Sequence, residues 1–431
     1  MLIVTLFSTL LLLMFLGVPI ALSLGLTAIG IMYWMGGADL VIMFAQRAYF
    51  GTASFPLLAV PFFILAGNLM NTGGITQRIF DVAQLCVGRI HGGLGHVNVI
   101  GSMIFAGMSG SAVADAAGLG VVEIRAMTKA GYTARFSAAI TAVSSTIGPI
   151  IPPSIPFVIY GSLTNVSVGD LFLAGIVPGV LMGFALMAVI ALEAKRRKLP
   201  RMAGRPSGRE ALRVLGGALP ALVMPPFIVG GILSGWFTPT EAAVAASIYA
   251  MFLGLVYYRE MRLADLPAVL WDSAKQTAQV MFIIAAAAPF GWVLIQQQVP
   301  NAIINAILGI SSTPWVVLLM VNVILLIMGM FIEGIAIMII TFPIFVPLVQ
   351  QIHVDPTHFG VVVVLNLMIG LVTPPVGMCL YAVSAISNVD MWELFAEMWT
   401  YVVALVVVLL VVTYVPDIVM WLPRTFGFAR G

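Results

Sequence analysis

The feature that most constrains this chain is an internal duplication of two short motifs. A Gly-Met pair and a later Pro-Pro pair begin at Gly107 and Pro152, and again at Gly329 and Pro374, so each motif recurs after 222 residues. That offset is about half of the 431-residue chain. Matched helix-breaking segments in two halves are typical of transporters built from two structural repeats. The duplication therefore predicts two halves with paired breaks in membrane helices.

Composition places both halves in a membrane. Hydrophobic residues make up 61% of the chain and charged residues only 8%, whereas soluble domains carry about a quarter charged residues. Apolar runs recur from end to end, and we expect about ten to twelve spans, counting re-entrant pieces separately. The apolar N-terminus resembles a signal peptide, but no basic residue precedes it and hydrophobicity resumes through Met35, so we expect a retained first span or a split pair. The predicted fold class is an all-α integral membrane protein.

A dense basic segment separates the halves. Eight lysines and arginines lie within residues 193–213, which predicts a cytoplasmic linker between a first repeat over 1–192 and a second over 214–431. A nucleic-acid-binding patch is the alternative, but no aromatic residues alternate with the basic ones and no folded module accompanies them.

Charge placement also predicts how the halves are turned. Three basic residues follow the first Gly-Met segment: Arg125, Lys129 and Arg135. The corresponding stretch of the second half, 350–358, contains no lysine or arginine. Equivalent connections are therefore expected on opposite sides of the membrane, which is the arrangement of an inverted-topology repeat.

Each Gly-Met pair opens a segment that is a poor straight span. The first is rich in glycine and carries Asp115 and Glu123, and an acidic residue facing lipid at the bilayer centre costs about 2.5 to 3.5 kcal/mol. A helix-turn-helix hairpin buried against protein removes that cost. We expect re-entrant hairpins over about 107–128 and 329–349, with tips near 109–114 and 333–334. Two ordinary spans with loosely packed glycines are the alternative.

The Pro-Pro pairs predict broken helices over about 148–154 and 370–377. Proline removes an amide donor and displaces the carbonyl one turn earlier, so these breaks free backbone oxygens at membrane depth. Such oxygens suit a small hard cation, and half-helix N-termini suit an anionic substrate group. Packing each break beside its hairpin tip would give two cation sites with a substrate between them. No chain of acidic and histidine side chains is evident, which favours sodium over proton coupling.

These motifs together carry a family resemblance. Residues 107–115 (Gly-Met-Ser-Gly-Ser-Ala-Val-Ala-Asp), the paired Pro-Pro segments and residues 61–70 resemble the large membrane subunit of tripartite ATP-independent periplasmic (TRAP) transporters, over essentially the whole chain. The resemblance implies a sodium-driven elevator transporter of small organic acids in the bacterial inner membrane. It also implies two partners, a small membrane subunit of four helices and a periplasmic substrate-binding protein. No segment corresponding to the small subunit precedes the first span, so the unfused form is expected.

The resemblance also assigns site residues. The first sodium site would consist of Ser109, Ser111, Gly148, Ile151 and Pro152. The second would consist of Glu333, Gly334, Gly370, Val372, Thr373 and Pro374. The expected substrate contacts are Ser109, Ser145, Ser154 and Glu333. Because Phe331 stands opposite Ser109 and Glu333 opposite Ser111 in the duplication, backbone carbonyls would supply more of the second site.

No transition-metal site and no cofactor are expected. The two cysteines, Cys86 and Cys379, are too few and too far apart for a disulfide framework or a metal cluster. Their role is expected to be packing of small apolar side chains. Sodium is therefore the one metal ion that the sequence predicts.

Three other functions remain open. Residues 107–110 match the Gly-x-Ser-Gly pattern of rhomboid intramembrane serine proteases, but the four histidines, one of which would act as the base, fall in or beside predicted loops. A channel would also use broken helices, although two inverted sites differ from one pore loop repeated by oligomerisation. A sodium- or proton-coupled organic-anion carrier of related fold without a binding protein is the nearest alternative. We expect a transporter and not an enzyme.

Overall fold

The computed structural model describes residues 2–200 and 207–426, and within these ranges the chain is helical with no strand. Nine helical stretches of the described residues are long and apolar enough to cross a membrane, and five shorter apolar helices accompany them. Arg201 and Arg205 of the predicted linker lie outside the described residues.

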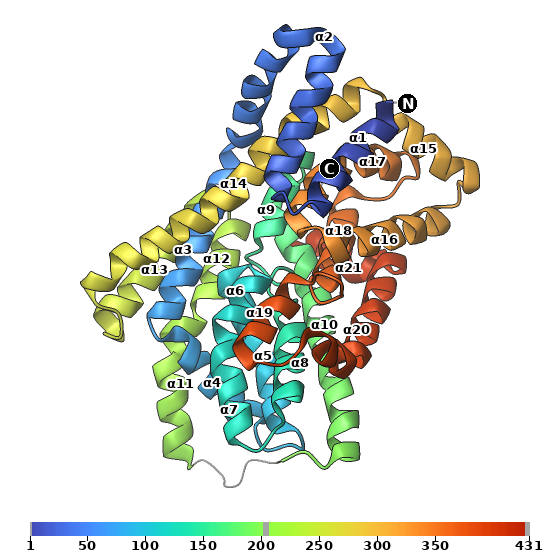
Figure 1. Cartoon of the computed structure of the whole chain (residues 1–431). Coiled ribbons are helices and arrows are strands. Elements are labelled where there is room, and N and C mark those ends of the chain that lie inside the picture. Colours follow the sequence, from blue (N-terminus) through green and yellow to red (C-terminus); the bar gives the residue numbers. More distant parts are fainter. Residues whose placement is uncertain (1, 201–206, 427–431) are drawn as a thin grey trace.

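The first half contains ten α-helices (Figure 1). They are α1 (Leu2–Phe15), α2 (Ile20–Thr52), α3 (Ala59–Thr72), α4 (Ile75–Val87), α5 (Gly93–Ser109), α6 (Ala112–Ala117), α7 (Leu119–Lys129), α8 (Ala134–Ser145), α9 (Ile155–Thr164) and α10 (Val168–Arg197). α2 bends at Gly36 and at Gly37, which has a φ of +66°. Its two arms form the projection at the top of Figure 1. The N-terminal region, for which the sequence predicts one span or a split pair, thus consists of α1 and the two arms of α2.

The described residues of the second half contain eleven α-helices. They are α11 (Gly208–Leu222), α12 (Met224–Leu233), α13 (Pro239–Phe252), α14 (Leu266–Gln296), α15 (Val299–Ile310), α16 (Pro314–Phe331), α17 (Gly334–Gln351), α18 (Pro356–Gly370), α19 (Met378–Ser387), α20 (Met391–Tyr414) and α21 (Pro416–Phe426). In each half, a helix and a sharp turn precede a helix broken at a Pro-Pro pair. Both Pro-Pro bonds are cis.

Helices of the two halves interlock. α14 crosses the molecule diagonally against α2, and α13 lies along α3 (Figure 1). On the other side of the bundle α20 packs against α8 and α10. The Tyr160 hydroxyl of α9 donates to the Pro356 carbonyl at the start of α18 at 2.6 Å, and the ring lies against Gly360. The Tyr401 hydroxyl donates to the Glu193 carboxylate at 2.9 Å. The two halves therefore share one core.

Candidate functional site

The first sharp turn lies at Gly110 and Ser111. α5 ends at Ser109 because Gly110 adopts the left-handed conformation, with a φ of +62°. Ser111 then caps α6, and its hydroxyl accepts the Ala114 N–H at 3.4 Å. The turn thus falls inside the tip region that the sequence predicts.

The helices entering both turns are longer than predicted. α5 starts at Gly93 and α16 at Pro314, whereas the sequence predicts hairpins that begin near residues 107 and 329. The glycines of α5 allow neighbouring helices to pack closely against it: a Cβ added to Gly95 would lie 3.2 Å from Ile190 of α10. This packing explains why α5 is continuous. Whether each helix pair enters and leaves on one side of the membrane stays a prediction.

The first turn packs against the first break. α8 ends at Ser145 and α9 starts at Ile155, so residues 146–154 are unwound between them. A Cβ added to Gly110 would lie 2.7 Å from the Pro153 carbonyl oxygen, and one added to Gly107 would lie 3.6 Å from the Pro152 carbonyl oxygen. At residue 110 only glycine permits this approach of backbone to backbone, whereas the 3.6 Å distance at Gly107 is an ordinary contact. Ile151 lies on the far side of the break, against Gly179.

Asp115 joins the turn to the break. The Ser109 hydroxyl donates to one carboxylate oxygen of Asp115, and a Cβ added to Gly148 would lie 2.4 Å from the other, Oδ2. Asp115 is 2% exposed, and Oδ2 is buried without a hydrogen-bond partner. The sequence marks Asp115 only as an acidic residue of a hairpin. Its position one helical turn after the cap, Ser111, is the signal that could have placed it in the site.

The second turn and break form a similar pair with different side chains. Glu333 caps α17 and accepts the Ala336 N–H at 3.2 Å, as Ser111 does in the first copy. The Val376 N–H donates to the Met330 carbonyl at 3.1 Å, which ties the break to the turn. Ile337 occupies the position equivalent to Asp115. The helix that follows the second turn, α17, therefore has no carboxylate equivalent to that of Asp115.

Gly334 is the first residue of α17, and the remaining residues predicted for the second site lie at the break. A Cβ added to Gly370 would lie 2.7 Å from backbone atoms of Gly329. The Thr373 hydroxyl donates to the Ile369 carbonyl at 2.8 Å, inside its own chain segment. Val372 and Pro374 are buried. The second break therefore meets the second turn through its backbone and not through side-chain oxygens.

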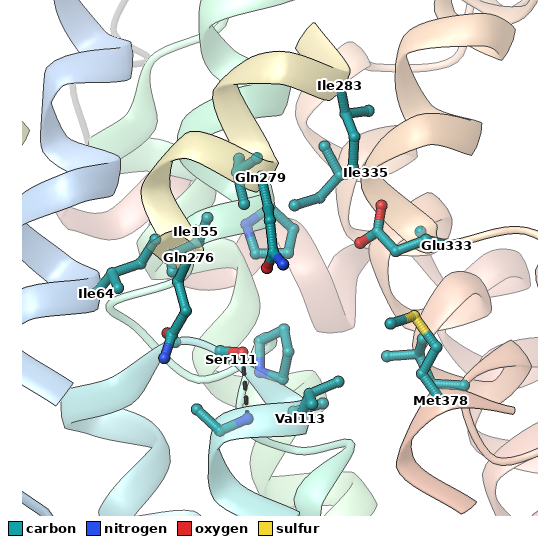
Figure 2. Close-up of a pocket in the computed structure, with 18 of the residues that line it drawn as sticks. Ile64, Ser111, Val113, Ile155, Gln276, Gln279, Ile283, Glu333, Ile335 and Met378 are labelled. Atoms are coloured by element: carbon teal, nitrogen blue, oxygen red, sulfur yellow. Dashed lines mark hydrogen bonds between the residues drawn. The ribbon is translucent and has the colours of Figure 1, made fainter. Parts of the chain in front are cut away.

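Both turns line one cavity of about 1050 Å³, to which the breaks contribute Pro149, Leu371, Val376 and Gly377. The break residues predicted for the two ion sites are not in its wall. Figure 2 shows Ser111 and Glu333 at its edge, among apolar side chains of several helices. These apolar side chains include Ile64, Val113, Ile155, Ile283, Ile335 and Met378. α9 and α19 both begin at this cavity, with Ile155 and Met378 in its wall. The arrangement suits a small molecule with an apolar part and a few polar groups.

Two of the four predicted substrate contacts lie on this cavity. Ser109 and Glu333 are in its wall, whereas Ser145 and Ser154 are not. The Ser145 hydroxyl donates to the Ala142 carbonyl at 2.8 Å. The Ser154 hydroxyl donates to the Pro149 carbonyl and accepts the Phe157 N–H as the cap of α9. Both are buried, and their contact with a substrate stays a prediction that this placement does not support.

Four amide side chains of the cavity have no counterpart in the predicted site. Gln276 and Gln279 come from α14 and point into the cavity in Figure 2. Asn68 and Asn71 come from α3. The signal for the glutamines is their spacing of three residues on one face of a long apolar helix.

Comparison with known proteins gives a consistent result over almost the whole chain. Residues 7–418 match the profile of the family described as tripartite ATP-independent periplasmic transporter, DctM component. The sialic acid TRAP transporter large permease protein of Vibrio cholerae is 43% identical over 96% of both chains. The C4-dicarboxylate TRAP transporter large permease protein of Pseudomonas aeruginosa is 44% identical over 91% of both. The 2,3-diketo-L-gulonate TRAP transporter large permease protein of Escherichia coli is 39% identical over 94% of this chain and 95% of its own length.

Proposed function

This chain belongs to the family of TRAP transporter large permease subunits, the DctM component, and we propose that a sodium gradient drives its import of a small organic acid through the cavity between the two turns. It is a multi-pass protein of the bacterial inner membrane, and it is a transporter subunit and not an enzyme. Membership implies a periplasmic substrate-binding protein and a small membrane subunit as partners.

The first sodium site rests on the unpartnered oxygen of Asp115. Moving a charge out of water costs several kcal/mol, and a partner of opposite charge offsets that cost. Oδ2 of Asp115 lies against Gly148 in the first break. A sodium ion held by Asp115 and Ser109 would satisfy this oxygen, with Ser111 and the carbonyls of 148–152 as further ligands. The break thus supplies the hard oxygen donors that such a cation prefers.

The second sodium site would depend on the backbone. Its proposed residues are Glu333, Gly334, Gly370, Val372, Thr373 and Pro374. The contact of Gly329 with Gly370 brings the second turn against carbonyls of the second break. Glu333 is the one acidic side chain among these residues, and it lies on the cavity wall. The two sites would share a backbone arrangement and differ in side-chain ligands.

The substrate would lie between the two ion sites. The N-terminal ends of α9 and α19 face the cavity, and the positive ends of their helix dipoles favour a carboxylate. Ser109 and Glu333 provide polar contacts at the two turns. The names of the relatives cover sialic acid, C4-dicarboxylates and diketogulonate, all small organic acids.

Transport would follow an elevator movement. We propose that 1–192 and 214–431 are inverted repeats, that each turn is the tip of a re-entrant hairpin, and that the turns and breaks move together as the transport domain. The crossed contacts of α2 with α14 and of α3 with α13 suit a scaffold against which such a domain moves.

Uptake should require both sodium and the binding protein. In vesicles that contain this chain with its small subunit, we expect accumulation of an organic acid only when the binding protein is added and sodium is higher on its side. A panel of radiolabelled carboxylates, each with its cognate binding protein, measures this. A protonophore should leave the initial rate unchanged.

Two outcomes would reject parts of the proposal. Uptake that ignores sodium and stops with the protonophore would show proton coupling. Uptake at the full rate without any binding protein would identify a carrier of related fold that works alone.

Ser154→Ala separates a helix cap from a substrate contact. Loss of the α9 cap should destabilise the protein by about 0.5 to 2 kcal/mol and leave the KM of uptake unchanged, because the hydroxyl bonds to Pro149 and Phe157. Thermal unfolding and uptake kinetics of the same preparation measure both. A raised KM with unchanged stability would place Ser154 in the substrate site instead.

A further inference from the structure

A smaller cavity of about 330 Å³ adjoins the central one. The two cavities share four amide side chains, Asn68 and Asn71 of α3 and Gln276 and Gln279 of α14. The other residues in the wall of the smaller cavity are mostly polar: Thr72, Asp272 and Lys275, with Val269. The four amides therefore mark the junction between the central cavity and a polar vestibule.

The glutamines of α14 are available to a ligand. Both are exposed. In Figure 2 the Gln279 amide points toward the space between Ser111 and Glu333, and the Gln276 amide lies beside Ser111. Their amides form no side-chain hydrogen bond with any other residue that the structure describes. An unpaired amide facing hydrocarbon costs about 1 to 3 kcal/mol or more, so their direction toward a water-accessible cavity is the favourable one.

The asparagines of α3 are held by protein partners. The Asn68 amide donates to the Ser273 hydroxyl at 2.9 Å, which links α3 to α14. The Asn71 carbonyl accepts the Thr76 hydroxyl at 3.0 Å, and its amide lies over Gly118, 2.7 Å from an added Cβ. The two asparagines are therefore held in place by protein partners. The two glutamines keep donors and acceptors that a ligand could use.

The vestibule leads toward the side of the basic linker. From the junction it follows the C-terminal end of α3 and the N-terminal part of α14. Arg259 and Arg262 lie just before α14, which predicts a cytoplasmic position for that end. Lys275 is the one basic side chain in the wall of either cavity within the described residues, and it pairs with Asp272 at 3.0 Å.

We propose that this amide junction is the route by which the substrate leaves for the cytoplasm, with Gln276 and Gln279 hydrogen-bonding its hydroxyl or carbonyl groups and Lys275 attracting its carboxylate. The substrate class is then a small carboxylate that carries further polar groups. This inference rests on the proposed transport function. It adds a polar route formed by helices outside the two turn and break pairs.

Cysteine labelling tests the route without any substrate. Gln276→Cys and Gln279→Cys are made in a chain whose Cys86 and Cys379 are alanine, assembled with the small subunit in inverted membrane vesicles. Anionic sulfonatoethyl and cationic trimethylammonioethyl methanethiosulfonate are the probes. We expect both cysteines to react at least tenfold faster than Ala274→Cys, which lies on the opposite side of α14 from Gln276.

The charge of the probe tests Lys275. In the Gln279→Cys chain, Lys275→Gln should lower the ratio of anionic to cationic labelling rates by about tenfold at low salt, and Asp272→Asn should raise it. A general distortion of α14 would move both ratios in the same direction. Unreactive cysteines at 276 and 279, or a ratio that does not follow the two charges, would overturn the proposal. Since labelling needs neither sodium nor substrate, its failure is distinct from a failure of sodium-driven uptake.

Discussion

Asp115→Asn should abolish sodium-driven uptake and leave an assembled protein. Asp115 holds a buried, unpartnered oxygen against the first break. Removing one partner of a buried ion pair costs about 3 to 5 kcal/mol, which corresponds to a fall in sodium affinity of about 100-fold or more. In sodium-free buffer the variant should be at least as stable as the parent, because a buried charge is gone. Sodium titrations of uptake and of thermal unfolding measure both effects.

Glu123→Gln is the matched control. Glu123 of α7 is also a buried carboxylate, 1% exposed, with an unpartnered oxygen, but it lies against Gly101 of α5, whereas Asp115 lies against Gly148 in the first break. This variant should keep the sodium dependence of the parent. If the two variants have equal effects, or if Asp115→Asn keeps normal sodium affinity, Asp115 is not an ion ligand.

Gly370→Ala should prevent stable assembly. A Cβ at this position would lie 2.7 Å from the Cα, carbonyl carbon and carbonyl oxygen of Gly329, and backbone atoms cannot rotate away. α16 and α18 would have to separate, and overpacking of this kind costs about 1 to 3 kcal/mol or more. The yield and thermal unfolding temperature of the purified complex give the measurement.

Gly148→Ala is the equivalent change in the first copy and should behave differently. Its Cβ would lie 2.4 Å from Oδ2 of Asp115, a side chain that can turn aside, and 3.2 Å from the Ser145 carbonyl oxygen, which is a much milder contact than the one at Gly370. Stability should therefore change little while the apparent sodium affinity falls. Equal losses of stability in both variants would contradict the view that the two breaks share a backbone and differ in ligands.

The features that sequence predicted well are those fixed by local chemistry. Gly110 and the Pro-Pro pairs restrict the backbone wherever they stand, so the turns and breaks lie where their residues predict. The hydroxyls of Ser145 and Ser154 were harder to place. A serine near a break has a nearby carbonyl as a ready partner, and both donate to one, so closeness to the break in sequence does not bring the hydroxyl to the cavity.

The missing residues of the site depend on packing between distant helices. Gln276 and Gln279 reach the cavity because α14 lies across α2 and α3, and no local motif encodes that crossing. Asp115 is a different case, since it lies six residues after Ser109 in the most informative motif of the chain. Its role becomes visible only when the first break is placed against it.

The contact of Tyr160 with Pro356 and Gly360 has a consequence for the timing of the cycle. Tyr160 stands on the half-helix after the first break, and its partners stand on the helix that leads into the second. This contact links the half-helix after the first break to the helix before the second. In the elevator movement proposed above, neither break would move without the other, so both proposed ions and the substrate would gain and lose contact with the same compartment together.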